Sequence, residues 1–463
     1  MMHFFDRDDE LNFLNRKYRS GKAELVILYG RRRIGKTELL MHFSEGKNML
    51  YFLGRLESKS DTLRRFNNLL VEFFGDARLL TSPLLSWDGI FDYLAEKAAS
   101  RLVLIFDEFP FLIERSPEII SVLQDKWDSA FKGTKLMMIL SGSSVSMMEK
   151  YALSYRSPLY GRRTGQWQVD KLDVTYLKEF FPGYAMEELV FVYSFLDMIP
   201  GYLVKFSPKI GLWKNVRERI LSKGEFLYEE VEILLREELR DPSNYMSIIS
   251  AIAGGAATSG EIHSKTQLDK SLLSKYLFIL EKLGILEKRK IITESYKSKL
   301  KARGSYALKD NFFDFWLRFV YLNKQQLERG DVDAVLDEIK KRSGEYVGRK
   351  FESFVASLVP RLNIMETTKI GRWWHKDREI DIVALDENKM KILFCECKWK
   401  DGVNAEKIAS MLSEKAKYVK WHNDRRKEIY AVFAKSFRKR ITKVEGKKAY
   451  CFDLKDLEKA MKL

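Results

Sequence analysis

The sequence is poor in the residues that build disulfides and metal centres. Its 463 residues include only three cysteines (Cys395, Cys397 and Cys451) and five histidines, and it contains no Cys-x-x-Cys pair. Three cysteines cannot form the framework of a disulfide-stabilised domain, and scattered histidines argue against a structural zinc site. We therefore expect reduced thiols, which are typical of a cytoplasmic protein.

Long apolar segments are also missing. The first residues, MMHFFDRDDELNFL, are acidic and lack the apolar core of a signal peptide. The longest stretch without a charged residue, 242–260, is long enough to span a membrane but is rich in Ser, Asn, Gly and Thr. We therefore expect no membrane helix and a cytoplasmic location.

Acidic residues are outnumbered by basic ones. Lys and Arg total 81 against 65 Asp and Glu, which gives a formal net charge of +16. This excess favours a polyanionic partner, either nucleic acid or an anionic membrane surface. A Lys- and Glu-rich surface of a heat-adapted protein explains the composition equally well.

The first third of the chain has the pattern of an α/β fold. Apolar runs of strand type occur at 25–29, 49–53, 102–106 and 136–140, with segments of helical periodicity between them. Short buried strands that alternate with helices indicate a mainly parallel sheet. The whole chain is long enough for about three domains.

The strongest motif follows the first of these runs. GRRRIGKT, at 30–37, fits the pattern GxxxxGK[ST] and precedes a helical segment, so its backbone N–H groups can cradle phosphate oxygens. Lys36 is expected to reach the β- and γ-phosphates of ATP, and Thr37 is expected to ligate Mg²⁺. The expected nucleotide contacts are Gly30, Arg31, Arg32, Arg33, Ile34, Gly35, Lys36, Thr37, Glu38 and Asp107.

Two acidic residues end the run at 102–106. Asp107 and Glu108 are expected at the carboxyl end of a strand, where open α/β sheets bind their ligands. Asp107 can belong to the Mg²⁺ shell, and Glu108 can orient or deprotonate the attacking water. Together with Lys36, these residues predict ATP hydrolysis.

Polar and basic turns follow. Ser141 or Ser143 can contact the γ-phosphate or the water, although a simple SGSS turn fits as well. Arg162, or its neighbour Arg163, can act on the γ-phosphate within the chain or across subunits, and a solvated basic turn is the alternative.

Several blocks within the first 170 residues resemble the archaeal ATPases of the STAND branch of AAA+-like P-loop NTPases. The blocks are FFDRDDELNFL, YGRRRIGKTELL, LVLIFDEFPFL, LSGSS and SPLYGRRTG. The resemblance implies a fold that binds ATP and Mg²⁺, with Lys36, Thr37, Asp107 and Glu108 in the roles given above. The family's RxxEL block corresponds here to Arg7, Asp9, Glu10 and Leu11.

The segment 241–310 resembles a winged helix-turn-helix. Its second motif helix has an apolar face at helical spacing, formed by Leu272, Leu273, Tyr276, Leu277, Leu280 and Leu283. Short or basic residues are expected to point outward: Lys270, Ser271, Ser274 and Lys275. The wing region is basic through Lys288, Arg289, Lys290, Lys297, Lys299, Lys301 and Arg303. This pattern suits DNA binding, whereas a protein–protein or interdomain role is the alternative.

The last segment combines acidic residues and a lysine. Glu352 falls on an expected helix, Asp381 on a strand, and Glu396 and Lys398 on one face of the next strand. A hairpin through 386–388 can bring Asp381 beside that strand. Converging carboxylates bind Mg²⁺, which polarises phosphate and activates water, and a lysine can stabilise the developing charge.

This D…ExK pattern with an upstream helical glutamate resembles the PD-(D/E)XK nuclease superfamily over about 345–435. Ile380 precedes Asp381 where the motif's name has proline. The resemblance implies Asp381, Glu396 and Lys398 as catalytic residues, and Glu352, Asp381 and Glu396 as metal ligands. A half-buried hairpin with a salt bridge is the alternative.

The sequence therefore predicts an α/β protein in five segments: a P-loop ATPase core at 1–171, a helical lid at 172–240, a winged helix at 241–310, a helical connector at 311–345 and a nuclease-like domain at 346–463. The predicted function is Mg²⁺-dependent ATP hydrolysis coupled to DNA binding or cutting. The alternative is a STAND-type signalling or regulatory switch whose C-terminal domain only binds. DNA is the expected macromolecular partner, and self-association into a homo-oligomer stays open.

Overall fold

The computed structural model describes residues 4–239, 241–293 and 305–462. The chain forms two compact units, Met1–Lys171 and Leu172–Leu463, which are described separately. Four of the basic residues expected in the wing lie outside the described residues: Lys297, Lys299, Lys301 and Arg303. None of the described helices has the length and apolar character needed to cross a bilayer. The five-segment division stays a prediction.

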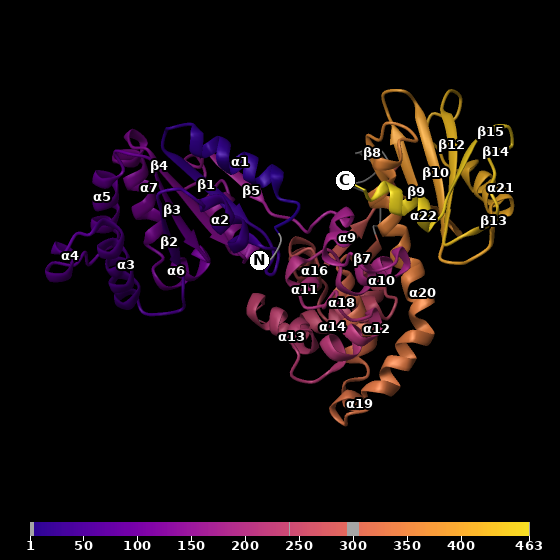
Figure 1. Ribbon diagram of the computed structural model, residues 1–463, viewed down its shortest axis with the longest axis horizontal. Helices are drawn as coiled ribbons and strands as arrows, with labels where there is room; N and C mark the ends of the chain where they lie inside the picture. Colours follow the sequence, from indigo (N-terminus) through magenta and orange to yellow (C-terminus); the bar gives the residue numbers. More distant parts are fainter. Residues whose placement is uncertain (1–3, 240, 294–304, 463) are drawn as a thin grey trace. The chain divides into compact units, whose positions relative to one another are not determined.

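The first unit is built on a five-stranded sheet in the order β2-β3-β4-β1-β5, and its pairings are all parallel (Figure 1). The strands are β1 (Glu24–Tyr29), β2 (Met49–Leu53), β3 (Leu102–Asp107), β4 (Leu136–Gly142) and β5 (Gly165–Gln168). The four apolar runs expected as strands are β1 to β4, so the predicted α/β class is confirmed. The central strands are almost wholly buried, as expected where helices cover both faces of a parallel sheet.

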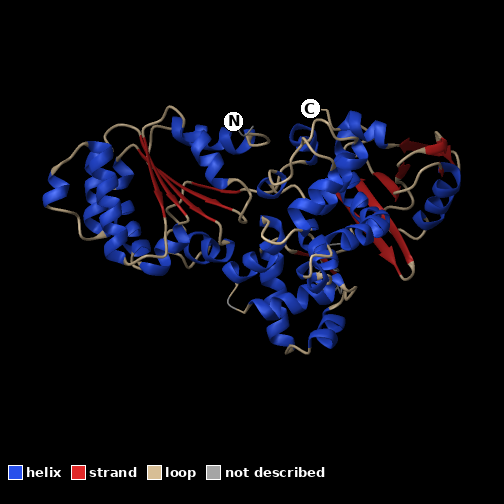
Figure 2. Cartoon of the chain, turned by 60° about the horizontal axis from the view of Figure 1, so that its bottom comes forward, coloured by secondary structure: helices blue, strands red, loops and turns tan. Residues whose placement is uncertain are grey.

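Helices lie beside this sheet (Figure 2). They are α1 (Asp8–Arg19), α2 (Lys36–Ser44), α3 (Lys59–Phe74), α4 (Arg78–Thr81), α5 (Trp87–Lys97), α6 (Phe109–Arg115), α7 (Ile119–Ser129), η1 (Phe131–Gly133), α8 (Val145–Met148) and η2 (Glu149–Leu153). Ser58 and Ser86 begin α3 and α5 by accepting backbone hydrogen bonds, a common N-cap. Phe66 of α3 and Trp87 of α5 pack on Phe106 of β3, with the Phe66 and Phe106 ring centroids 5.7 Å apart.

The second unit begins with a helical region. Its elements before residue 240 are η3 (Val174–Tyr176), α9 (Leu177–Phe180), α10 (Met186–Leu196), α11 (Pro200–Leu203), α12 (Leu212–Asn215), η4 (Val216–Leu221) and α13 (Phe226–Glu238). Helices also follow the winged-helix segment: α18 (Asn311–Phe315), η5 (Trp316–Tyr321), α19 (Lys324–Glu328), α20 (Val332–Leu358) and η6 (Val359–Leu362).

Three helices and a two-stranded antiparallel ribbon have the element order of a winged helix. They are α14 (Pro242–Ala253), α15 (Ser259–Thr266), α16 (Lys270–Lys282), β6 (Leu286–Arg289) and β7 (Ser305–Leu308). The four residues expected to point outward from α16 are exposed, whereas the expected core face is buried except for Leu272, which is half-buried. Asp269 caps α16 by accepting from the N–H groups of Ser271 and Leu272.

The 27-residue helix α20 joins the helical region to the C-terminal sheet (Figure 1). It continues through the division expected at 345–346, although Gly344 and Gly348, which are unfavourable inside a helix, flank it. The buried Tyr346 hydroxyl donates to two backbone carbonyls, and Lys350 forms a buried ion pair with Asp314 at 2.7 Å. These contacts fix the segment of the helix that carries Glu352.

The C-terminal part of the second unit is a six-stranded sheet in the order β14-β15-β12-β10-β9-β8. This part of the chain contains β8 (Lys369–His375), β9 (Arg378–Asp386), β10 (Lys391–Lys398), β11 (Val403–Asn404), α21 (Ala405–Ala416), β12 (Lys427–Ala434), β13 (Phe437–Lys439), β14 (Lys443–Val444), β15 (Lys447–Phe452) and α22 (Leu454–Ala460). β11 and β13 pair with each other in a separate two-stranded sheet. β9 and β10 form the antiparallel hairpin expected from the sequence, with Ile382 opposite Cys395. β10 pairs with β12 in parallel.

The chain after β6 leaves the winged helix and joins this sheet. Ile291 forms a parallel bridge with Arg372 of β8, and the N–H of Ile292 donates to the Arg372 carbonyl at 3.1 Å. Both isoleucines also pack against the apolar core of the sheet. The chain after β6 therefore attaches the winged helix to the β8 edge through an isolated β-bridge.

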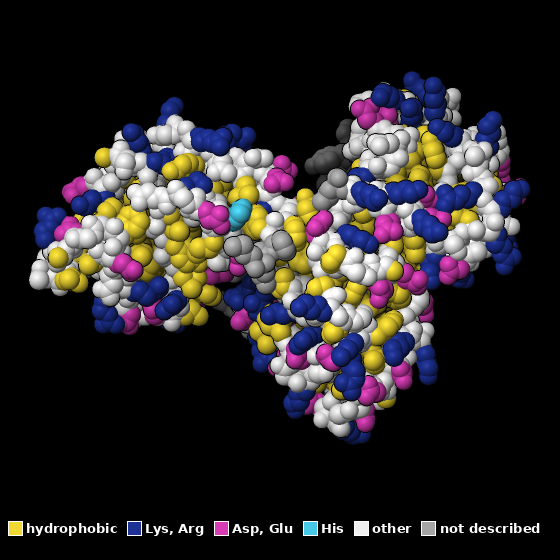
Figure 3. Space-filling view, viewed as in Figure 1, with side chains coloured by type: hydrophobic (Ala, Val, Ile, Leu, Met, Phe, Trp, Pro, Cys, Tyr) yellow, Lys and Arg dark blue, Asp and Glu magenta, His cyan; other side chains and the backbone are white. Residues whose placement is uncertain are grey.

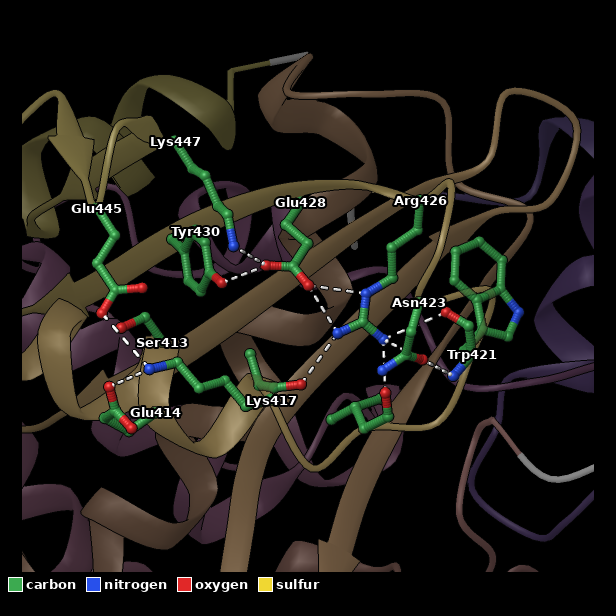
Figure 4. Close-up of polar contacts among 12 residues, drawn as sticks. Ser413, Glu414, Lys417, Trp421, Asn423, Arg426, Glu428, Tyr430, Glu445 and Lys447 are labelled. Carbon is green, nitrogen blue, oxygen red and sulfur yellow. Dashed lines mark hydrogen bonds and ion pairs between the residues drawn. The ribbon is translucent and has the colours of Figure 1, made fainter.

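Arg426 ties the end of α21 to the sheet (Figure 4). Its buried guanidinium donates to the carbonyls of Ala416, Val419 and Trp421 at 3.0, 2.6 and 3.2 Å, and it pairs with Glu428 at 2.6 Å. The last carbonyls of a helix have no partner within the helix, so the guanidinium satisfies them.

Lys and Arg side chains lie beside Asp and Glu side chains over much of the face shown in Figure 3, on both units. Some form surface ion pairs, such as Lys59 with Glu118 at 2.7 Å. On this face the positive excess is distributed, so it does not decide between a polyanionic partner and a heat-adapted surface.

Replacing Arg426 by Met should destabilise the α21 region by about 3 kcal/mol, because three carbonyls lose their donor and the half-buried Glu428 loses one of its partners, keeping Lys447 and Tyr430. Lys427→Met, at the exposed neighbouring residue, is the matched control and should change stability by less than about 0.5 kcal/mol. Hydrogen exchange of the α21 amides in the full chain measures both. Equal protection in the two variants would refute the anchoring role of Arg426.

Candidate functional site

The 30–38 loop, as we call the turn between β1 and α2 together with the first residues of α2, lies at the carboxyl edge of the parallel sheet. Gly35 precedes α2 with φ of 90°, a left-handed conformation that glycine adopts without strain. Lys36 is buried, and its Nζ donates to the carbonyls of Gly30 and Arg31 at 2.8 and 3.1 Å. An ammonium group enclosed by a loop that leads into a helix N-terminus is an arrangement that suits phosphate.

Asp107, the last residue of β3, accepts hydrogen bonds on both carboxylate oxygens. Oδ2 accepts from Thr37 Oγ1 at 2.7 Å and from the Tyr51 hydroxyl at 2.9 Å, and Oδ1 accepts from the N–H of Glu108 at 3.1 Å. Burial and the Asp107 carboxylate raise the pKa of Tyr51, so the phenol remains a donor. Hydroxyl and carboxylate oxygens are the ligands that Mg²⁺ prefers. Thr37 and Asp107 are in direct contact and fit that ion.

Glu108 lies next to this carboxylate in a left-handed conformation, with φ of 50°. The Ser143 hydroxyl is 2.7 Å from both Glu108 carboxylate oxygens, and the Ser143 N–H donates to Oε2 at 3.2 Å. Gly54 lies so close to the Glu108 carbonyl that a Cβ there would collide with it. Of the two serines considered from the sequence, Ser143 therefore contacts the expected base, whereas Ser141 is buried within β4.

Arg7 connects the RxxEL block to this loop. Its buried guanidinium pairs with Glu10 at 3.1 Å and donates to the carbonyls of Ile34 and Asp170, both at 2.9 Å. Ile34 belongs to the phosphate loop, and Asp170 follows β5 at the end of the first unit. One side chain thus holds α1, the loop and the exit of the unit together.

Arg162 lies at the edge of the sheet opposite the phosphate loop. It precedes β5, which runs parallel to β1, so it lies at the amino ends of these strands. Its guanidinium bonds to Asp128 and to the Pro158 carbonyl. A strand of six residues separates the two edges by about 17 Å.

A cavity of about 540 Å³ lies at that amino edge. Its basic lining residues are Lys22, Lys132, Lys135, Arg162 and Arg163. Because the strands are parallel, the phosphate loop lies at their carboxyl ends, whereas these basic residues lie at their amino ends.

The four C-terminal residues singled out from the sequence come together. Asp381 on β9 accepts the N–H of Cys397 of β10 at 2.8 Å, next to Glu396 and Lys398. The Lys398 ammonium is 2.8 Å from Glu396 Oε1. Burial, together with the nearby Glu396 and Glu352 carboxylates, raises the pKa of Asp381 to about 7. Glu352 is therefore close enough to Asp381 for its charge to contribute to this rise.

Two cations that the sequence interpretation did not include neutralise this centre. Arg372 of β8 pairs with Glu352 at 2.5 Å. Lys415 of α21 bonds to both oxygens of Glu396 at 3.0 Å. Within the described parts of the chain, no three His, Cys, Asp or Glu side chains are grouped so that they could hold a metal ion. With two of its acids paired to cations, this geometry does not fit a three-acid metal site.

Comparisons with known proteins bear on the first unit and on the whole chain. Residues 4–206 match a family described as "ATPase domain predominantly from Archaea", and residues 316–411 match "Archaea bacterial proteins of unknown function". The uncharacterized protein MJECL04 of Methanocaldococcus jannaschii is 38% identical over 460 residues, which cover 98% of this chain and 99% of that protein. The chain belongs to the archaeal ATPase family.

Two further proteins are similar over parts of this archaeal ATPase. The uncharacterized ATP-binding protein MJ0423 of the same organism is 54% identical over 46 residues, 10% of this chain and 78% of that protein. The Walker-type ATPase PABY2304 of Pyrococcus abyssi, at 23% identity and a TM-score of 0.52, covers 68% of this chain and 96% of that chain. This second match shows the fold alone. The predicted enzyme class, an ATPase, is confirmed by the family, and DNA binding and cleavage stay predictions.

The sequence interpretation of the archaeal ATPase missed three residues that contact the candidate sites. Tyr51 offered one signal, a polar hydroxyl inside the apolar run MLYFL. Arg372 and Lys415 offered none, because each belongs to an element that contributed no acid to the expected centre.

Replacing Ser143 by Ala should lower kcat for ATP roughly tenfold and leave KM within about twofold, because Glu108 loses a charged hydrogen bond worth about 1.5–3 kcal/mol. Ser144→Ala is the matched control, since the Ser144 hydroxyl makes only a long contact of 3.4 Å with Ser146 within the described part of the chain. Steady-state ATP hydrolysis measures both variants. Equal kcat values for the two would contradict a positioning role for Ser143.

The raised pKa of Asp381 predicts a pH-dependent stability. An aspartate in an unfolded chain has a pKa of about 3.9, so the native state holds the proton more tightly, and the free energy of unfolding falls as pH rises from about 4 to about 7. Asp381→Asn cannot ionise and should therefore melt at a higher temperature than the wild type at pH 8, with the gap closing toward pH 4. Asp377→Asn, at an exposed neighbour, is the control. A gap that is the same at both pH values in metal-free buffer would refute the prediction.

Proposed function

We propose that the archaeal ATPase hydrolyses ATP at the 30–38 loop with the residue roles expected from the sequence. Lys36 turns from the loop carbonyls to the β- and γ-phosphates, and Thr37 and Asp107 hold Mg²⁺, which neutralises phosphate charge when it is bound. Glu108 accepts a proton from the attacking water while Ser143 holds its carboxylate. The contact between Thr37 and Asp107 at 2.7 Å carries this proposal.

In this proposal, Arg162 can act only on ATP that is bound to a second copy of the chain. Because it lies at the amino edge of its own sheet, its role on the γ-phosphate requires the nucleotide of a second chain. A homo-oligomer is therefore part of the proposal for Arg162, and the role of this arginine fails if the ATPase acts as a monomer.

We further propose that the second unit binds duplex DNA through the winged helix and the C-terminal sheet together. The exposed lysines of α16 suit phosphate contacts, and the bridge between Ile291 and Arg372 attaches the winged helix to β8. Arg372 lies on that same strand and reaches Glu352, so the attachment point adjoins the acidic centre. One duplex on the winged helix is then presented to the residues Asp381, Glu396 and Lys398.

A specific observation favours a second candidate, the STAND-type switch with a C-terminal domain that binds but does not cut. Arg372 and Lys415 already neutralise Glu352 and Glu396, and a carboxylate paired to a buried cation is a poor site for a metal. In that case the nucleotide state controls DNA binding, and Lys398 serves as a phosphate contact. The cytoplasmic location expected from the reduced cysteines stays a prediction.

Two variants test the nucleotide site. Lys36→Ala should abolish ATP turnover, because the phosphates lose their buried cation. Glu108→Gln should retain ATP binding in calorimetry and lose hydrolysis, because the amide cannot accept the proton. Turnover that survives in both variants would show that the site is misassigned.

A nicking assay separates the two candidates for the C-terminal domain. Supercoiled and linear DNA are incubated with the full chain and Mg²⁺ or Mn²⁺, comparing the wild type with Asp381→Ala and with the exposed control Asp377→Ala. Cutting that is lost only in Asp381→Ala supports a nuclease. If the wild type binds DNA but cuts no form of it with either ion, the switch is supported and the catalytic roles of Asp381, Glu396 and Lys398 are refuted.

A further inference from the structure

The outward stripe of α16 contains one residue that does not suit a solvated helix face. Ser271, Ser274, Lys275 and Phe278 are exposed and recur at spacings of three and four, so they lie along one side of the helix. The Phe278 ring is 58% exposed. Among the described residues of 241–310, Phe278 is the only large hydrophobic side chain that is exposed.

Positive charge surrounds this ring. Lys275 lies one turn before Phe278, and the Lys282 ammonium is 5.7 Å from the centroid of the ring. Glu281 is the one acidic residue within α16. An apolar group flanked by lysines matches a partner that is apolar at one point and anionic around it. The polyanionic DNA duplex fits this description, whereas a hydrophobic protein groove would not need the flanking lysines.

The major groove of DNA offers one apolar feature, the methyl group of thymine. The seven helical steps from Ser271 to Phe278 advance about 10.5 Å along a helix axis, which corresponds to about three base-pair steps. A helix that lies in the groove can therefore place the two serine hydroxyls and the phenyl ring on neighbouring base edges, while the lysines face phosphates.

We propose that Phe278 reads thymine by packing on its methyl group in the major groove, and so gives this protein a preference for thymine at one position of its DNA site. The proposal rests on the proposed DNA binding of the second unit. It assigns a specificity-determining residue where the sequence interpretation identified only serines and lysines.

The test uses the full chain and duplexes selected from a random library for binding. Each selected duplex is compared with a copy in which uracil, which lacks the methyl, replaces every thymine. The wild type should bind the uracil copy roughly fourfold more weakly for each methyl that it contacts. Phe278→Ala should bind both copies equally, at the level of the wild type on uracil. Because the ring is exposed, the variant should fold as the wild type does, which its melting temperature checks.

Leu322→Ala is the matched control, since Leu322 is 73% exposed outside the winged helix. This variant should keep the preference for thymine. Wild-type protein that binds the thymine and uracil duplexes equally would overturn the proposal while DNA binding stands. If no duplex binds even at low salt, the proposed DNA binding fails and the role of Phe278 fails with it.

Discussion

The hydrogen bond between Thr37 and Asp107 depends on the direction and order of the strands in the first unit. Thr37 belongs to the helix after β1, and Asp107 ends β3, with β4 lying between these strands in the sheet. Because the strands are parallel, their carboxyl ends meet at one edge, where β2 contributes Tyr51 and the chain after β4 contributes Ser143. Four strands thus supply one cluster, and a change in the direction of any of them would remove a member.

The same constraint explains what the sequence could and could not predict. The loop at 30–38 and the pair of acids after β3 follow from local patterns, and the hairpin of β9 and β10 follows from alternation and a short turn. Tyr51 requires the register of β2 against β3, strands that are separated by about 50 residues of chain. The sequence left open whether Arg162 acts within its own chain or across subunits, because a local motif does not say which edge of the sheet it will reach.

In the second unit, the cost of burying charge determines which residues of the acidic centre are paired with cations and which has a raised pKa. A carboxylate taken out of water needs a proton, a metal ion or a cation nearby. Glu352 and Glu396 form ion pairs with cations from β8 and α21. Asp381 instead accepts a backbone N–H, and burial and two like charges outweigh the attraction of Lys398, so its pKa is raised. The cations come from elements that carry no motif residue. The D…ExK spacing could therefore predict the acids but not their ion pairs or their pKa values.

The backbone contact that Ile291 and Ile292 make with Arg372 of β8 has a practical consequence for dissecting the chain. An uncovered edge strand presents unpaired backbone groups that invite pairing with another molecule. A fragment cut at residue 346 would expose this edge and would also shorten α20, whose first half lies in the helical region. The C-terminal domain, isolated at the boundary that the sequence suggests, would therefore be prone to aggregate, and a soluble truncation would have to retain the wing.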